Sequence, residues 1–196
     1  MNQASVLLEH GGVCYTYCMK WYTHAVIGAN AVWLVPLFAD VSSATMIYAA
    51  LGAFGGLLPD IDAGWAGTSG AKIHHIGYGI FRPFRGLFRH RGFFHSQLFV
   101  TIFFCALIPT AFFIDSFFPL MLTVGYASHL LIDFWNCGMQ YFYPMRREVT
   151  FVPKIFRFRV GSTGDDLFFL LGIFGLLFFI FSHWSAFQVT ESLIRL

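Results

Sequence analysis

Nine histidine and aspartate side chains stand beside the apolar segments of this chain, each at or near a segment end. They are His24, Asp60, Asp62, His90, His95, His129, Asp133, Asp165 and Asp166. An ionisable side chain close to hydrocarbon is costly, so its presence at each of these places needs a physical reason. Imidazoles and carboxylates mixed in one cluster are what zinc or a similar divalent ion binds.

Each of these motifs alone has a plainer explanation. A single histidine at a membrane interface can simply be hydrogen-bonded, and paired acids after Pro59 can form a turn. His129 and Asp133, four residues apart, project from one face of a helix and can be a surface pair. The acids at 165 and 166 can cap a helix. The metal interpretation therefore rests on joint placement. A structural zinc takes four protein ligands and a catalytic zinc three, so nine candidates predict two or three ions.

The composition predicts an integral membrane protein. Of the 196 residues, 57% are hydrophobic and only 11% are charged, against roughly 25% charged in a soluble domain. The net charge of +2 is too small to favour nucleic acid as a partner. The four cysteines are scattered, and they suggest no disulfide framework.

Apolar segments recur along the chain and predict an all-α, polytopic membrane bundle of about five helices. They lie at about residues 25–39, 43–58, 97–114, 117–134 and 167–184. The last three reach the usual spanning length of about 20 residues, whereas the first two are shorter and are expected to form an antiparallel hairpin. Gly52 and Gly56 give the second helix a small-residue face for close packing. Pro109 is expected to kink the third helix, and Pro119 suits a first helical turn.

The basic residues orient this bundle. Eleven of the twelve lysines and arginines fall in the N-terminal tail or in the polar stretches 59–96 and 135–166, which five spans place on one side. The positive-inside rule puts that side, and the N-terminus, in the cytoplasm. All nine candidate ligands then lie at the cytoplasmic membrane interface. We expect residues 1–22 to be a tail and residues 23–196 a single membrane-embedded helical domain.

Four motifs resemble, in order, those of the YdjM-type family of bacterial inner-membrane proteins, to which metal-dependent hydrolase activity is ascribed. The most specific is the His-Arg-Gly-x-x-His-Ser block at 90–96, which is preceded by Leu-Leu-Pro-Asp-Ile-Asp at 57–62. The others are Thr23-His24 and the Gly-Tyr-Ala-Ser-His-Leu-Leu-Ile-Asp run at 125–133, which Gly138 and Pro144 follow.

The resemblance implies a distant relationship to zinc-dependent phospholipases C and single-strand nucleases, which are helical and hold clustered zinc ions. It implies that the metal ligands are His24, Asp60, Asp62, His90, His95, His129 and Asp133. The family pattern also places a carboxylate, often Glu, at the start of the fifth helix. In this chain that position is filled by Asp165 or Asp166.

Such a centre would suit hydrolysis of a phosphoester by metal-activated water. Asp62 or Asp166 could accept the proton of the water, and Arg91 could bind phosphate oxygens. Arg146 and Arg147 fit better as contacts to anionic lipid head groups. Because the site is expected at headgroup level, the predicted substrate is a membrane lipid or a lipid-linked phosphoester.

The alternative is a non-enzymatic protein that binds divalent metal, such as a transporter or sensor. Transport favours ionisable residues at mid-bilayer within broken or repeated spans, and the sequence has neither. A metalloprotease is disfavoured because His-Glu-x-x-His is absent. His74 and His75 could add ligands, although a plain loop explains them as well.

Overall fold

The computed structural model describes residues 19–37, 46–60, 92–136, 139–145, 147, 149–153, 156–157 and 162–182. In these ranges the regular structure is helical, apart from one isolated β-bridge between Met139 and Val149. The helices are α1 (Trp21–Ala31), α2 (Met46–Gly55), α4 (Gln97–Leu107), α5 (Thr110–Phe113), α6 (Phe118–Asn136) and α7 (Thr163–Ser182). Short 3₁₀ segments cover Val32–Leu37 and Phe93–His95. The all-α prediction is confirmed for this part of the chain.

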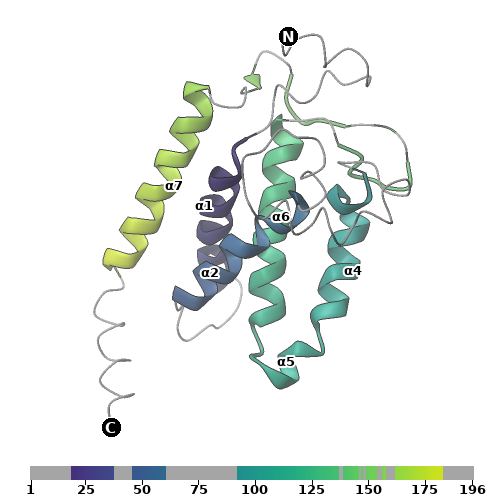
Figure 1. The fold of residues 1–196 in the computed structure, drawn as a ribbon, viewed down its shortest axis with the longest axis vertical. Coiled ribbons are helices and arrows are strands. Elements are labelled where there is room, and N and C mark those ends of the chain that lie inside the picture. The colour runs from purple at the N-terminus through teal and green to yellow at the C-terminus, as the bar shows by residue number, and fades with distance from the viewer. Residues whose placement is uncertain are drawn as a thin grey trace, which may run out of the picture.

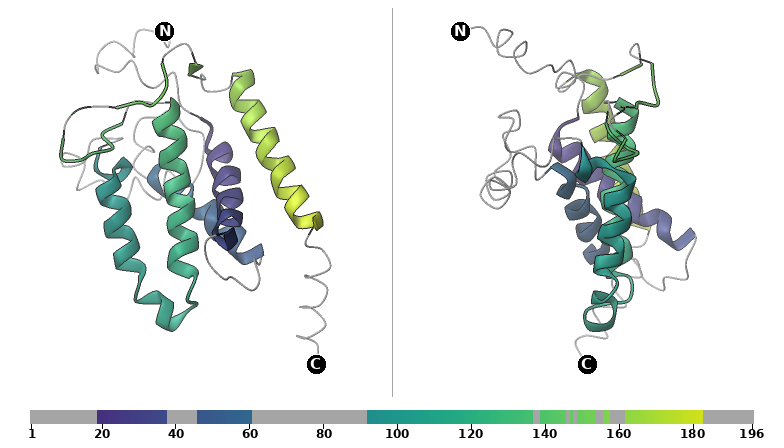
Figure 2. Two further views of the ribbon diagram at one scale, coloured as in Figure 1. Left: turned by 180° about the vertical axis from the view of Figure 1, so that it is seen from behind. Right: turned by 90° about the vertical axis from the view of Figure 1, so that its right-hand side faces the viewer.

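The longer helices stand in a row, in the order α7, α1, α6 and α4 (Figures 1 and 2). Helix α2 crosses this row and packs against both α1 and α6, whereas α7 packs against α1. A small core cluster of Val32, Val35 and Met121 lies where α1, its 3₁₀ extension and α6 meet. The row therefore brings α1 and α6 together with α2 across them.

Glycines allow this close crossing. A Cβ atom on Gly28 of α1 would lie 2.3 Å from the carbonyl oxygen of Gly52 in α2, and one on Gly125 of α6 would lie 2.1 Å from the same oxygen. Gly28 also faces Gly56, and Gly52 faces Val32, so α1 and α2 run antiparallel as expected. The predicted small-residue face is confirmed, and it serves both neighbours of α2.

The third apolar segment is shorter than predicted. Ser96 caps α4 by accepting a hydrogen bond from the Phe99 backbone N–H, but α4 ends at Leu107 and only the single turn α5 follows Pro109. Proline lacks an N–H and clashes with the preceding turn, so the helix breaks there. The predicted kink at Pro109 is thus a full break, and Pro119 lies in the first turn of α6, as predicted.

The Asn30 side chain makes one of the polar contacts that join α7 to α1. The Asn30 side-chain N–H group donates to the carbonyl oxygens of Val26 in its own helix and Gly172 in α7, at 2.8 Å each. Gly172 and Gly175 make room, because a Cβ on either would approach Val26 or Asn30 within 2.7 Å. Small residues and an interhelical hydrogen bond are typical of helix contacts within membranes.

We expect Asn30→Ala to lower the stability of the protein by about 1 kcal/mol, the usual size of such an interhelical hydrogen bond. Thermal unfolding in detergent micelles measures it. Ser182→Ala is the matched control, because the Ser182 hydroxyl bonds to carbonyls of its own helix. Equal unfolding temperatures for the two variants would contradict the role given to Asn30.

By length and composition, α7 alone among the described helices could cross a membrane; the apolar stretches Met46–Asp60 and Gln97–Phe113 are shorter. Large apolar side chains are nevertheless exposed well beyond α7. On α5, Phe112 and Phe113 are 84% and 88% exposed, and Ile47 and Leu131 project from α2 and α6. Apolar surface of this extent marks contact with a membrane or a partner protein.

Candidate metal centre

Five of the nine predicted ligands meet in one cluster between helices. His24 lies in the first turn of α1, Asp60 follows α2, His95 ends the 3₁₀ turn before α4, and His129 and Asp133 lie in the second half of α6. The three histidines and Asp133 are at most 2% exposed, whereas the Asp60 side chain is 22% exposed. Of the helix ends that the sequence predicts on one face, those of α1, α2, α4 and α6 therefore converge.

Four of the five ligand atoms form a closed ring. The His95 Nε2 atom lies 3.6 Å from Asp60 Oδ1 and 3.8 Å from Asp133 Oδ2. The His129 Nε2 atom lies 3.7 Å from each of the same two oxygens. Two imidazole nitrogens thus alternate with two carboxylate oxygens around a common centre.

These separations fit a shared cation better than direct bonding. Hydrogen bonds from N–H to oxygen span 2.7–3.2 Å, so contacts of 3.6–3.8 Å are too long. Two ligands of one zinc ion, each about 2.0–2.1 Å from the metal, stand about 3.4 Å apart in tetrahedral geometry. The separations in the ring are slightly wider than that value, and the ligand atoms of Asp60, His95 and His129 all lie within 4.8 Å of one another.

The second nitrogen of His129 supports the same conclusion. Its Nδ1 atom lies 2.7 Å from the backbone carbonyl oxygen of Gly56. A carbonyl only accepts, so Nδ1 carries a proton here, and Nε2 is the ring nitrogen that faces Asp60 and Asp133. Nε2 has no hydrogen-bond partner among the described residues. Metal-binding histidines almost always donate their other N–H to a carbonyl or carboxylate in this way.

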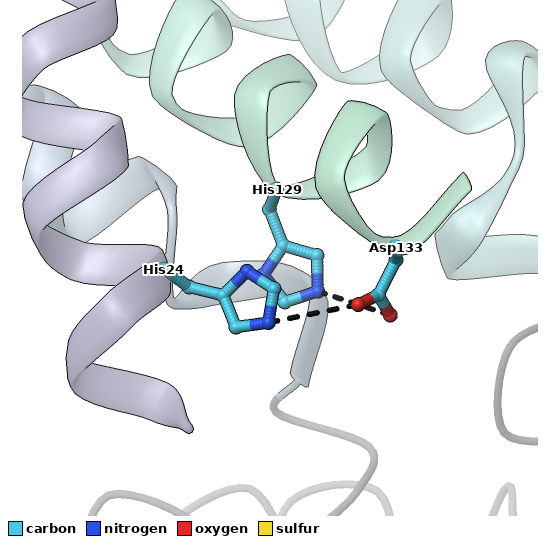
Figure 3. Close-up of side chains that lie close together, drawn as sticks. All are labelled: His24, His129 and Asp133. Carbon is cyan, nitrogen blue, oxygen red and sulfur yellow. Dashed lines mark ion pairs between the residues drawn. The ribbon is translucent and has the colours of Figure 1, made fainter. Parts of the chain in front are cut away.

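His24 extends the cluster on the other side of Asp133. Its Nε2 atom lies 3.6 Å from Asp133 Oδ1, and its ring stacks on that of His129 with centroids 3.9 Å apart. Figure 3 shows the His24 and His129 rings directing nitrogen atoms at the Asp133 carboxylate. The two oxygens of Asp133 therefore face different imidazoles. His24, His129 and Asp133 form one potential ligand group, and Asp60, His95 and His129 form a second.

Neighbouring hydrogen bonds hold the ligands in place. The Tyr126 hydroxyl of α6 donates to the Phe94 carbonyl oxygen at 2.6 Å, which fixes the turn that carries His95. The Ser96 hydroxyl donates to the Phe93 carbonyl at 2.6 Å, and its own oxygen accepts from the Phe99 N–H to cap α4. Sequence reasoning missed Gly56 and Tyr126 as supports, although both lie within or beside the motifs it used.

The acids at the start of α7 lie elsewhere. Asp165 is fully buried, and its Oδ1 accepts a hydrogen bond from the Thr23 hydroxyl at 2.8 Å. Asp166 is 53% exposed and pairs with the Lys20 ammonium at 2.6 Å. That hydrogen bond raises the pKa of Lys20 above its ordinary value. Among the described residues, neither ligand group includes these two acids.

The remaining predicted site residues lie outside the described part of the chain. They are the candidate ligands Asp62 and His90, the candidate phosphate-binding residue Arg91, the optional ligands His74 and His75, and Arg146. Their roles stay predictions.

Comparison with known proteins agrees with the motif resemblance. The sequence model of a family described as YdjM inner membrane protein matches residues 19–194. No curated protein matches the chain, and neither does any solved structure.

Proposed function

The chain belongs to the YdjM inner membrane protein family, and on that premise we propose that it is a membrane-embedded, metal-dependent hydrolase. Its substrate is a phosphoester of a lipid or of a lipid-linked molecule. The observation that carries the proposal is the convergence of three imidazoles and two carboxylates in one cluster.

The proposal includes a multi-pass arrangement in the bacterial inner membrane. The family description, the span-length helix α7 and the exposed apolar side chains of α2, α5 and α6 support it. The first turns of α1 and α7 and the end of α6 all lie towards the top of the view in Figure 1. With the N-terminus in the cytoplasm, as the basic residues predict, the metal centre lies at the cytoplasmic interface.

The donor set fits divalent ions of the zinc type, and Asp133 can be shared between two of them. When bound, such ions lower the pKa of a water molecule and stabilise negative charge on a leaving oxygen. His95, His129 and Asp60 hold one side of the centre and His24 holds the other. Asp60, the most exposed of the five, marks the side from which a substrate reaches it.

Proton transfer needs a carboxylate that is not occupied elsewhere. Asp166 is engaged by Lys20 at the surface, so of the two predicted bases Asp62 suits the role better. Arg91 would bind the phosphate oxygens, since a guanidinium matches them with two parallel hydrogen bonds.

The test is a hydrolysis screen in mixed micelles, with phosphatidylglycerol, phosphatidylethanolamine and a polyprenyl diphosphate as probes. We expect cleavage of at least one lipid, more than about 100-fold loss on chelation, and recovery when Zn²⁺ or Mn²⁺ is added back. We expect a loss of this size because chelation removes the metal charge that activates the attacking water. Hydrolysis that chelation leaves unchanged would contradict the proposal.

A non-enzymatic metal-binding protein is the second candidate. The burial of four of the five ligands favours it, because a closed site suits retention or sensing of an ion as well as catalysis. Metal uptake into sealed vesicles that contain the protein, with no hydrolysis of any probe, would select a transporter.

A further inference from the structure

We propose that Asp165 is a positioning residue that fixes His24 through Thr23, so that docking of α7 on α1 completes the His24 side of the metal centre. The inference rests on the proposed metal centre. It gives Asp165 a role different from the ligand role that the motif resemblance implies.

The contact between α1 and α7 is built around a buried polar pair. Thr23 and Asp165 are both fully buried, and the Thr23 hydroxyl donates to Asp165 Oδ1 at 2.8 Å. The Lys20 backbone N–H approaches the same oxygen at 3.5 Å. Asp165 is the third residue of α7, where the positive end of the helix dipole favours a carboxylate.

Helix geometry links this pair to the metal centre. Consecutive residues on an α-helix project about 100° apart, so α1 can direct Thr23 towards α7 while it directs His24 towards α6. The His24 ring then stacks on His129, and its Nε2 faces Asp133. A rotation of α1 about its axis would move both side chains together, and the bond to Asp165 opposes it.

Further contacts along the same seam hold α7 in place. The Asn30 side chain bonds to the Gly172 carbonyl, Tyr22 packs edge-on against Phe169, and Lys20 pairs with Asp166. Of these contacts between α1 and α7, only the Thr23 to Asp165 bond is made by the residue next to His24 in the sequence. Its loss should therefore affect metal binding out of proportion to its effect on folding.

Four variants separate positioning from ligation. Thr23→Val removes the hydroxyl at constant volume, and Thr23→Ser retains it. Asp165→Ala removes the acceptor, whereas Asp165→Asn retains an acceptor oxygen and removes the negative charge that makes a carboxylate a strong metal ligand. Each purified, full-length variant is titrated with Co²⁺ in detergent, and the visible absorption spectrum and the number of bound ions are recorded.

We expect Thr23→Val and Asp165→Ala to weaken Co²⁺ binding by about 10–100-fold, the range typical for lost supports of a ligand. Both should alter the Co²⁺ spectrum, and the double variant should be no weaker than either single one. Thr23→Ser and Asp165→Asn should stay within about threefold of the natural protein. A purely structural bond would lower stability and leave the spectrum of the bound ion unchanged.

The opposite pattern overturns the inference. If Asp165 is a ligand, Asp165→Asn loses a bound ion as Asp165→Ala does, and Thr23→Val binds like the natural protein. If Thr23→Val does not fold, the comparison of Asp165→Asn with Asp165→Ala decides alone. Failure of the natural protein to bind Co²⁺ would instead overturn the proposed function, so the two failures are distinguishable.

Discussion

Replacing His129 with alanine is expected to abolish metal binding at the whole centre. His129 belongs to both potential ligand groups, and its Nε2 faces Asp60 and Asp133 at 3.7 Å each. Loss of a supporting contact alone costs about 10–100-fold in affinity, so loss of a shared ligand should exceed about 100-fold. Equilibrium dialysis against Zn²⁺, followed by elemental analysis, measures the change.

The control for this variant lies two residues away on the same helix. Leu131 is 63% exposed on α6 and outside both ligand groups, so Leu131→Ala should bind metal like the natural protein. His129→Ala also leaves the Gly56 carbonyl without its imidazole donor, so the folded state of each variant is checked by thermal unfolding. A folded His129→Ala protein with unchanged Zn²⁺ content would contradict the site.

Replacing Gly52 with valine should prevent the helices from assembling. A Cβ at this position would lie 2.3 Å from Val32 Cγ2 and 2.4 Å from the Gly28 carbonyl oxygen, and Gly125 of α6 packs on the same residue. Overpacking usually costs about 1–3 kcal/mol. We expect about 3 kcal/mol or more here, because one of the obstructing atoms is backbone that no rotamer change can move.

Thermal unfolding in detergent measures this loss, and Zn²⁺ binding should fall with it, since Asp60 follows directly on the segment that α2 anchors. Ala50→Val is the matched control, because Ala50 is exposed on the same helix. Its effect should stay within about 0.5 kcal/mol. Equal stability of the two variants would show that the close crossing of α2 is not required.

The sequence predicts the centre well where topology alone decides. Helices of alternating direction return their ends to one side, which is enough to group His24, Asp60, His95, His129 and Asp133. The small-residue crossing at Gly52 also follows from spacing, because glycines four apart form one smooth face.

Contacts that depend on side-chain direction could not be predicted in this way. To predict the bond from Thr23 to Asp165, one must know how α1 is rotated about its axis relative to α7. To predict the bond from His129 to the Gly56 carbonyl, one must know how closely α2 approaches α6. Asp165 and Asp166 are adjacent in sequence, yet one is buried and the other pairs with Lys20 at the surface. Hydropathy alone extended the third helix to residue 114, although Pro109 already predicted a disturbance there, and the structure ends α4 at Leu107.

X-ray absorption spectroscopy of the purified, full-length protein tests the metal centre most directly. We expect bound zinc or a similar divalent ion whose ligands are imidazole nitrogen and carboxylate oxygen at about 2.0–2.2 Å. The signal should disappear in His129→Ala. A metal content no higher than that of His129→Ala, or coordination dominated by sulfur, would rule out the proposed metal centre.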